Sequence, residues 1–224
     1  MQLFIESAEI GKIKDALSWG IVDGVLLSPA LVAATGRRPA ELYREIASAV
    51  DCPVCVETPA VTFQDITTEA RSLARLGRNL LLMVPITKEG LRAVRVLEAE
   101  NIRTIVAVTF SPLQALLAAK VGASYVSLHI DLLEEAGQSA AEAINQIKTI
   151  YRNHSFSTKI MAVGVRQPLA VLEAAVVGAD CCATGYDVLG QLYQHLLTLP
   201  APGRAPKKIV TPGQASESVR EQSA

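Results

Sequence analysis

The chain has 224 residues, half of them hydrophobic and only 4% aromatic, a length that suits one domain. A core built from Ala, Val, Leu and Ile is typical of layered α/β folds. The formal net charge is −1, and no basic stripe indicates binding to nucleic acid or to a membrane surface. The longest apolar runs are too short to span a bilayer, and Met1 leads directly into a strand-like run. We therefore expect a cytoplasmic protein without a signal peptide.

Short apolar strands alternate with helical patterns eight times along the chain. The predicted strands are Leu3–Ile5, Gly24–Leu27, Val54–Glu57, Leu80–Val84, Thr104–Val108, Tyr125–Leu128, Lys159–Val163 and Cys182–Thr184. Alternating strands and helices imply parallel pairing with right-handed crossovers, and eight such units close into a (β/α)₈ barrel. An open doubly wound sheet of six units is the alternative, but no Gly-x-Gly-x-x-Gly follows the first strand.

The predicted barrel needs only residues 1–199. Residues 200–224 contain four prolines, two glycines and many polar side chains, so we expect a flexible tail or a segment that docks on a neighbour. Within the barrel, Cys52 and Cys55 have the C-x-x-C spacing of a redox pair or half of a zinc site. The simpler interpretation is that both are small residues at the start of a strand, since no second C-x-x-C completes a zinc site.

Residues at the carboxyl ends of the strands are the candidates for chemistry, because barrel enzymes place their active sites there. Strand alternation predicts which of them face the mouth of the barrel. After the sixth strand, Ser127, His129 and Asp131 share the inward parity. The candidates from the other strands are Glu6, Ser28, Glu57, Met83, Thr109, Gly164, Arg166, Thr184 and Tyr186.

Four stretches carry a family resemblance. Residues 3–8 read LFIESA, residues 23–29 read DGVLLSP, residues 110–123 read FSPLQALLAAKVGA, and residues 166–180 read RQPLAVLEAAVVGAD. On these motifs the chain, from residue 1 to about 198, resembles the transaldolase family, in particular the short branch that includes fructose-6-phosphate aldolase. The resemblance implies a single barrel, activity on a sugar or small carbonyl compound, and ring-like homo-oligomers.

The family forms a Schiff base with a lysine at the end of strand four, in a Lys-Ile/Val-Pro context. Here the same stretch reads Met83-Val-Pro, and methionine cannot form an imine. The lysines elsewhere do not replace it. Lys88, Lys120 and Lys148 are expected in helices, and Lys159 opens a strand at the opposite end of the barrel. We therefore expect the imine mechanism, and with it ordinary aldolase activity, to be absent or very weak.

Other positions of the family pattern also differ. Glu6 stands in place of an aspartate, Ser28 in place of an asparagine, and His129 in place of an aromatic residue that assists proton transfer. A phosphate-binding arginine is replaced by Leu132 and a serine by Gly164, which leaves only Arg166 of the phosphate clamp. A sugar-phosphate substrate is therefore not expected.

The polar replacements predict a site that still has a function. We expect His129, Glu57 and Glu6 to be catalytic, with His129 as a general acid/base that titrates near neutral pH. The substrate-binding candidates are Ser28, Thr109, Asp131, Arg166 and Thr184. The expected function is lyase or isomerase chemistry by proton transfer on a small hydroxy-carbonyl or sugar ligand, without a cofactor.

Two alternatives remain open. Glu6, Glu57, His129 and Asp131 could hold a divalent metal that polarises the carbonyl in place of the imine. The protein could instead be a pseudoenzyme that only binds a metabolite or serves as a structural subunit. In that case His129 is a polar residue at the barrel rim, and Arg166 pairs with Asp131 or Glu57. The glutamates would then be hydrogen-bonded to each other or to the backbone.

Overall fold

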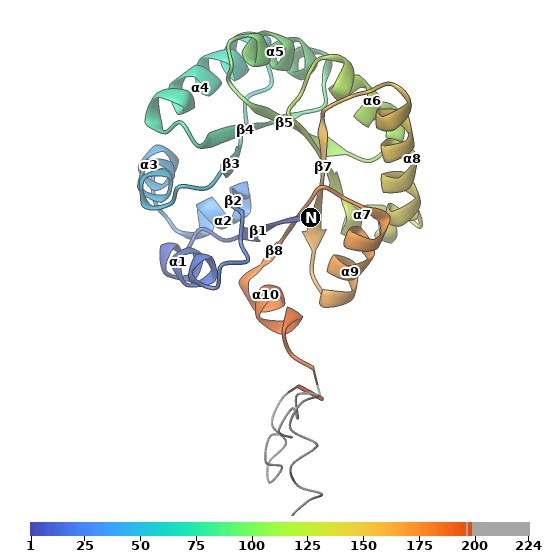
Figure 1. The fold of residues 1–224 in the computed structure, drawn as a ribbon. Helices are drawn as coiled ribbons and strands as arrows, with labels where there is room; N and C mark the ends of the chain where they lie inside the picture. The colour runs from blue at the N-terminus through green and yellow to red at the C-terminus, as the bar shows by residue number, and fades with distance from the viewer. Residues whose placement is uncertain (196, 199–224) are drawn as a thin grey trace, which may run out of the picture. The chain divides into compact units, whose positions relative to one another are not determined.

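A closed barrel of eight parallel strands forms the centre of the computed structural model, which describes residues 1–195 and 197–198 (Figure 1). The strands are β1 (Gln2–Glu6), β2 (Gly24–Leu27), β3 (Val54–Glu57), β4 (Leu80–Pro85), β5 (Thr104–Thr109), β6 (Tyr125–His129), β7 (Lys159–Val165) and β8 (Cys181–Gly185). Each strand pairs with its neighbours in chain order, and β1 pairs with β8 to close the barrel. The predicted (β/α)₈ barrel is confirmed, and an open sheet is excluded.

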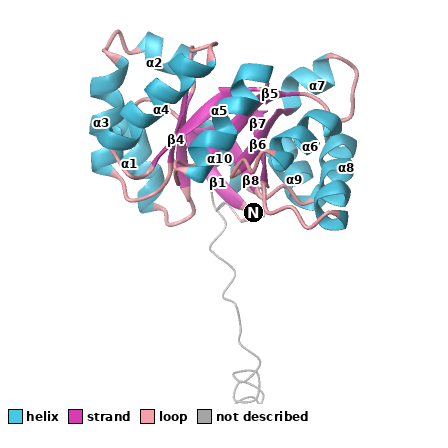
Figure 2. Cartoon of the chain, turned by 90° about the horizontal axis from the view of Figure 1, so that it is seen from above, coloured by secondary structure: helices cyan, strands magenta, loops and turns pink. Residues whose placement is uncertain are grey.

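Helices surround the strands as an outer ring (Figure 1). They are α1 (Ile10–Ser18), α2 (Pro29–Ala34), α3 (Pro39–Ala49), α4 (Phe63–Leu76), α5 (Lys88–Ala99), α6 (Pro112–Lys120), α7 (Ile130–Glu135), α8 (Ala140–Asn153), α9 (Pro168–Val177) and α10 (Tyr186–Leu192). The short helices α2 and α7 directly follow β2 and β6, so they mark the carboxyl end of the barrel, opposite the chain's N-terminus (Figure 2). None of the helices in the described part of the chain is long and apolar enough to cross a membrane.

Two strands carry irregularities near their carboxyl ends. The register of β5 shifts between Val106 and Thr109, and that of β7 shifts between Ala162 and Val165. Each shift contains a residue with a left-handed backbone, Val108 at φ 59° and Gly164 at φ 74°. Such bulges rotate the following side chains, so strict alternation no longer tells which of them face the barrel interior.

Apolar side chains fill the barrel up to the level of the strand ends. The interior cluster consists of Phe4, Leu26, Cys55, Leu81, Met83, Ile105, Ala107, Tyr125, Met161, Val163, Cys181 and Ala183. A second, larger cluster lies between the strands and the helices, and Cys182 belongs to it. Cys181 and Cys182 therefore point to opposite faces of β8, as neighbours along a strand do. All four cysteines are free thiols, as the simpler interpretation of Cys52 and Cys55 requires.

Carboxylates at the amino end of the barrel are hydrogen-bonded to backbone. Asp23 accepts the N–H of Leu3, and Asp180 accepts the N–H of Ile160, each at 2.8 Å. Glu98 accepts the N–H of Thr104, also at 2.8 Å. These acids satisfy backbone donors where strands begin, so their role is to stabilise the fold.

The barrel lies within one compact unit, Met1–Leu192. The second unit, Tyr193–Ala224, is described only at residues 193–195 and 197–198, where the N–H of Thr198 donates to the carbonyl of His195 at 2.9 Å. The polar tail expected for residues 200–224 lies outside the described residues.

Candidate functional site

A cavity of about 540 Å³ opens at the carboxyl ends of the strands. Its lining residues are Glu6, Leu26, Ser28, Leu31, Glu57, Met83, His129, Asp131, Val163, Gly164, Val165, Arg166, Gly185, Tyr186, Asp187, Val188 and Gln191. The cavity therefore brings together the three expected catalytic residues and, of the five expected substrate-binding residues, Ser28, Asp131 and Arg166. A pocket of this size at this end of a barrel is the usual place for a small-molecule site.

Met83 belongs both to the barrel interior and to the cavity lining, and only 3% of it is exposed. It lies on β4, in register with Glu57 on the neighbouring strand β3. No lysine of the described residues lines the cavity. Lys159 lies at the start of β7, where its Nζ donates to the Gln2 side chain at 3.3 Å, far along the strand from the carboxyl end.

Glu6 is the last residue of β1 and is half-buried in the cavity wall. Burial raises its pKa above the ordinary value, and Asp131 adds to this effect. The hydroxyl of Ser28 and the positive charge of Arg166 oppose it. Ser28 follows β2 directly and precedes Pro29, the first residue of α2, so the strand end and the helix start together fix its position.

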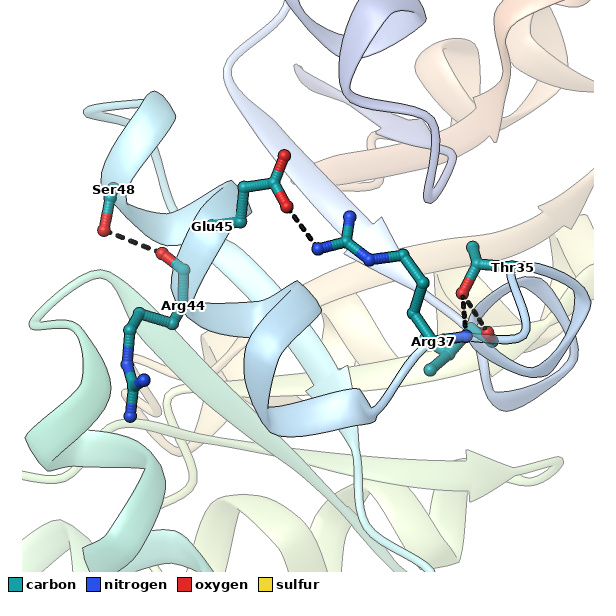
Figure 3. Close-up of polar contacts among 6 residues, drawn as sticks. Thr35, Arg37, Arg44, Glu45 and Ser48 are labelled. Carbon is teal, nitrogen blue, oxygen red and sulfur yellow. Dashed lines mark hydrogen bonds and ion pairs between the residues drawn. The ribbon is translucent and has the colours of Figure 1, made fainter.

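The segment after β2 shapes one side of the cavity through Leu31 of α2. Thr35, at the end of α2, donates its hydroxyl to the carbonyl of Val32 and accepts the N–H of Arg37. The Arg37 guanidinium then forms an ion pair with Glu45 of α3 (Figure 3). These contacts tie the end of α2 to α3 and hold the loop between them in place.

Glu57 ends β3 and is half-buried, with no hydrogen-bond partner for its side chain among the described residues. Burial raises its pKa, and no neighbouring charge or donor opposes that effect. The interpretation that the glutamates are held by each other or by backbone therefore does not apply to Glu57. A carboxyl group in this state is protonated over a wider pH range than usual, so it can donate a hydrogen bond to a bound oxygen.

His129 ends β6 and is half-buried. Its ring lies 6.1 Å from that of Phe110, centroid to centroid, with the planes tilted by 31°. Phe110 is itself held by its N–H, which donates to the side chain of Gln114 on α6 at 2.8 Å. Burial lowers the pKa of His129, and the negative charge of Asp131 partly opposes this. At neutral pH the imidazole is therefore uncharged and can accept a proton.

Asp131 and Arg166 form an ion pair at the rim. Oδ2 of Asp131 accepts Nε of Arg166 at 3.0 Å and Nη2 at 2.8 Å, and Oδ1 accepts the N–H of Leu132 at 2.9 Å. The Asp131 side chain is 14% exposed and that of Arg166 is 78% exposed. Of the two interpretations of Arg166, the structure shows the ion pair, with Asp131 and not Glu57 as partner.

Two expected substrate-binding residues, Thr109 and Thr184, do not line the cavity. The hydroxyl of Thr109 donates to the carbonyl of Ser127, and that of Thr184 donates to the carbonyl of Val165 at 2.5 Å. Both are fully buried. Thr184 follows Ala183, which faces the barrel interior, so alternation turns Thr184 to the helix side. Both hydroxyls serve the backbone of a neighbouring strand.

Helix α10 contributes a side of the cavity of which the sequence patterns predicted only Tyr186. Tyr186, Asp187 and Gln191 line it together, because α10 begins directly after β8. Tyr186 donates its hydroxyl to Asp15 of α1 at 2.6 Å, and this contact ties α10 to α1. Asp187 lies two residues after the end of β8, and this position was the sequence signal that could have predicted it. The inward direction of Gln191 depends on how α10 lies against the barrel.

The residues considered as metal ligands do not form a metal-binding cluster. Across residues 1–195 and 197–198, no three His, Cys, Asp or Glu side chains come together in an arrangement that could hold a metal ion. Glu6, Glu57, His129 and Asp131 line one cavity without converging on one point. Asp131 is also turned toward Arg166.

Comparison with known proteins finds a matching family model and several similar relatives. The family model described as Transaldolase/Fructose-6-phosphate aldolase matches residues 3–223. A probable transaldolase of Aquifex aeolicus and one of Hydrogenobaculum sp. are each 45% identical over 198 residues, which cover 88% of this chain and 91% of each relative. A probable transaldolase of Caldicellulosiruptor saccharolyticus is 44% identical over 199 residues, covering 88% of this chain and 92% of the relative.

A solved structure of a mutant flavocytochrome b2 with benzoylformate matches with a TM-score of 0.59 at 14% identity. The match covers 84% of this chain and 58% of that one, and it shows a shared barrel fold alone. The family model and the relatives show more than the fold, because they match nearly the whole barrel and the relatives are 44–45% identical to this chain. This chain belongs to the transaldolase/fructose-6-phosphate aldolase family.

Proposed function

We propose that this chain catalyses proton transfer on a small hydroxy-carbonyl compound, in lyase or isomerase chemistry that uses no imine. One observation carries the proposal. A half-buried imidazole, His129, and two half-buried carboxyl groups, Glu57 and Glu6, line the same cavity at the carboxyl end of the barrel. Carboxylates at the amino end of the barrel accept hydrogen bonds from backbone N–H groups, whereas Glu57 has no such partner in the described part of the chain.

The imine route is closed in this proposal because Met83 occupies the strand-four position at which the family resemblance places the lysine. A thioether is not an amine, so it cannot condense with a carbonyl carbon. Without the imine, the carbonyl must be activated by a hydrogen-bond donor instead. The raised pKa of Glu57 keeps this carboxyl group protonated to higher pH than usual, which suits it as that donor.

His129 is the base in the proposed reaction. Its lowered pKa leaves the imidazole uncharged at neutral pH, able to remove the proton from the carbon next to the carbonyl. The electron pair of that C–H bond becomes the new C=C bond, and the carbonyl oxygen receives the proton of Glu57. His129 then returns its proton to the former carbonyl carbon, while the hydroxyl on the neighbouring carbon gives its proton to the Glu57 carboxylate and becomes the new carbonyl, which completes an isomerisation. In an aldol reaction the enediol carbon adds instead to a second carbonyl carbon, His129 gives its proton to the oxygen of that carbonyl, and the enediol hydroxyl returns its proton to Glu57 as the first C=O reforms.

Glu6 and Ser28 form the second polar group in the cavity. The nearby hydroxyl of Ser28, together with the charge of Arg166, lowers the pKa of Glu6 and keeps more of this carboxyl ionised than burial alone would allow. We propose that Glu6 accepts a hydrogen bond from a substrate hydroxyl and so orients the carbon chain between His129 and Glu57. A carboxylate is a strong acceptor for such a hydroxyl.

Exchange of substrate protons with solvent tests this proposal directly. Dihydroxyacetone is incubated with the full chain in D₂O, and loss of the carbon-bound proton signal is followed by ¹H NMR. We expect exchange above the protein-free rate, and a loss of roughly 100-fold or more in His129→Ala, the usual contribution of a general base. Glu57→Gln should lose rate as well, because an amide cannot deliver a proton.

Borohydride treatment of the same mixture should give no covalent adduct in the mass spectrum. An adduct on the wild-type chain, or unchanged exchange in His129→Ala, would contradict the proposal. The pseudoenzyme alternative predicts a different pattern: dihydroxyacetone raises the melting temperature, yet the wild-type chain shows no exchange. The metal-assisted alternative predicts that exchange disappears with a chelator and returns with a divalent metal.

We also propose that the chain assembles into a homo-oligomer. Large apolar side chains are exposed on two helices, Leu113 and Leu117 on α6 and Leu169, Leu172 and Val176 on α9. On each helix these side chains recur three or four residues apart and so share one face, and an exposed apolar helix face usually marks an interface. Light scattering should give a mass several times 23.9 kDa. A charged residue at Leu172 should lower that mass.

A further inference from the structure

The ion pair of Asp131 and Arg166 places a negative group of the protein on the cation at the cavity rim. We infer that Asp131 acts as an internal anion that occupies Arg166, so that the cavity takes an uncharged hydroxy-carbonyl compound and excludes phosphate-bearing ones. The inference rests on the proposed function for the carbonyl chemistry. The exclusion of phosphate depends only on the arrangement of charged side chains.

The contacts of Asp131 are those that a bound anion would make. Nε and Nη2 of Arg166 both point at one oxygen, at 3.0 and 2.8 Å, and the N–H of Leu132 in the first turn of α7 donates to the other, at 2.9 Å. A guanidinium edge together with backbone N–H is a common environment for a phosphate group. An oxyanion placed on Arg166 would meet a carboxylate that is only 14% exposed and already bound.

The backbone of β7 is shaped to admit this carboxylate. Gly164 lies in the bulge of β7 with φ 74°, and a Cβ built on it would lie 2.0 Å from Oδ1 of Asp131 and 2.5 Å from its Cγ. Any side chain at position 164 would therefore displace Asp131. The same bulge places Arg166, two residues further on, at the cavity rim. Gly164, Asp131 and Arg166 thus form one unit in which each residue's position depends on the others.

The remaining charges of the cavity agree with this inference. Glu6, Glu57, Asp131 and Asp187 line it, whereas Arg166 is the one arginine or lysine among the lining residues of the described chain. This arginine is thus already paired, and the ionised acids beside it would repel a second negative group. A ligand that carries hydroxyl and carbonyl oxygens but no ionised group avoids this repulsion.

Binding of inorganic phosphate to the full chain tests the inference. We expect the wild-type chain to bind phosphate weakly, and Asp131→Asn to bind it at least about tenfold more tightly by isothermal titration calorimetry, because the guanidinium is released. Adding Arg166→Met to Asp131→Asn should remove the gain. Asp131→Ala serves as a second variant if the asparagine form does not fold.

Asp187→Asn is the matched control, since it removes one negative charge from the same cavity without touching Arg166. Equal phosphate affinity in wild type and Asp131→Asn would overturn the inference, and so would an equal gain in Asp187→Asn. Phosphate binding does not depend on turnover, so His129→Ala should bind phosphate like the wild-type chain. Loss of the proposed catalysis and failure of this inference are therefore seen in separate measurements.

Discussion

Replacing Gly164 by alanine is the most direct test of the geometry around Asp131. The substitution adds one methyl group, but it does so at φ 74°, where an L-residue is strained, and 2.0 Å from Oδ1 of Asp131. The carboxylate must then move and give up its hydrogen bond from Leu132 N–H as well as its pair with Arg166. The change is small in volume, yet it acts on two independent features of the structure.

The expected cost follows from these two features. A left-handed backbone costs an L-residue roughly 1–2 kcal/mol relative to glycine. Loss of a hydrogen bond at the half-buried Asp131 adds about 1 kcal/mol. The pair with Arg166 adds little, since that guanidinium is 78% exposed and screened by solvent. We therefore expect Gly164→Ala to lower the free energy of unfolding by about 2–3 kcal/mol, or roughly 4–12 °C in melting temperature for a chain of this size.

Alanine variants of two other glycines separate the cost of backbone strain from the cost of displacing Asp131. Gly137 has φ 73° with no atom within 4 Å of a built Cβ, so Gly137→Ala measures backbone strain alone. Gly185 lines the same cavity with open space and no left-handed backbone, so Gly185→Ala should be nearly neutral. Urea unfolding of all three variants is the assay. If Gly164→Ala costs no more than Gly137→Ala, Asp131 is not held where the structure places it and the argument fails.

Three further predictions concern the barrel interior and the cavity. Met83→Lys should create a borohydride-trappable adduct with dihydroxyacetone, seen by mass spectrometry, and absence of the adduct in a folded variant would show that position 83 does not face the carbonyl. Glu57→Gln should raise the melting temperature at pH 8 but not at pH 4. Burial raises the pKa of this carboxyl in the folded chain, so its ionisation opposes folding only when the pH rises above the ordinary pKa of a glutamate. An equal change in melting temperature at both pH values would exclude burial of the charge as the cause. Ser127→Ala should leave stability unchanged or raise it by up to about 1 kcal/mol, because the buried Oγ of Ser127 has no hydrogen-bond partner in the described chain; a clear loss in thermal unfolding would reveal a partner.

The strands and their order follow from the sequence because each strand of a parallel barrel is a short apolar run between turn signals. Both ends of β2 and β3 match the expectation, and the other strands are only one or two residues longer at one or both ends. The extra residues include Glu6, His129 and Val165, which continue the backbone pairing at the cavity rim. Backbone pairing does not require an apolar side chain, so hydrophobic patterns end before the strand does.

Most of the cavity's acid and base residues could also be predicted, because strand ends in a barrel converge on one mouth. His129, Glu57 and Glu6 each end a strand whose position was evident, and all three line the cavity. Thr109 and Thr184 could not be placed in this way. Their hydroxyls bind neighbouring strands, and that choice depends on a bulge in β5 and on the parity of β8.

Sequence alone determined the barrel, the order of its strands and the presence of an imidazole and several carboxyl groups at one end. Only the tertiary structure decided which charges meet. The ion pair of Asp131 with Arg166 depends on the bulge at Gly164, and the place of Asp187 depends on how α10 packs. The physical reason is that hydrophobic periodicity reports burial along one strand or helix, whereas contacts across the mouth depend on backbone irregularities and packing between distant segments.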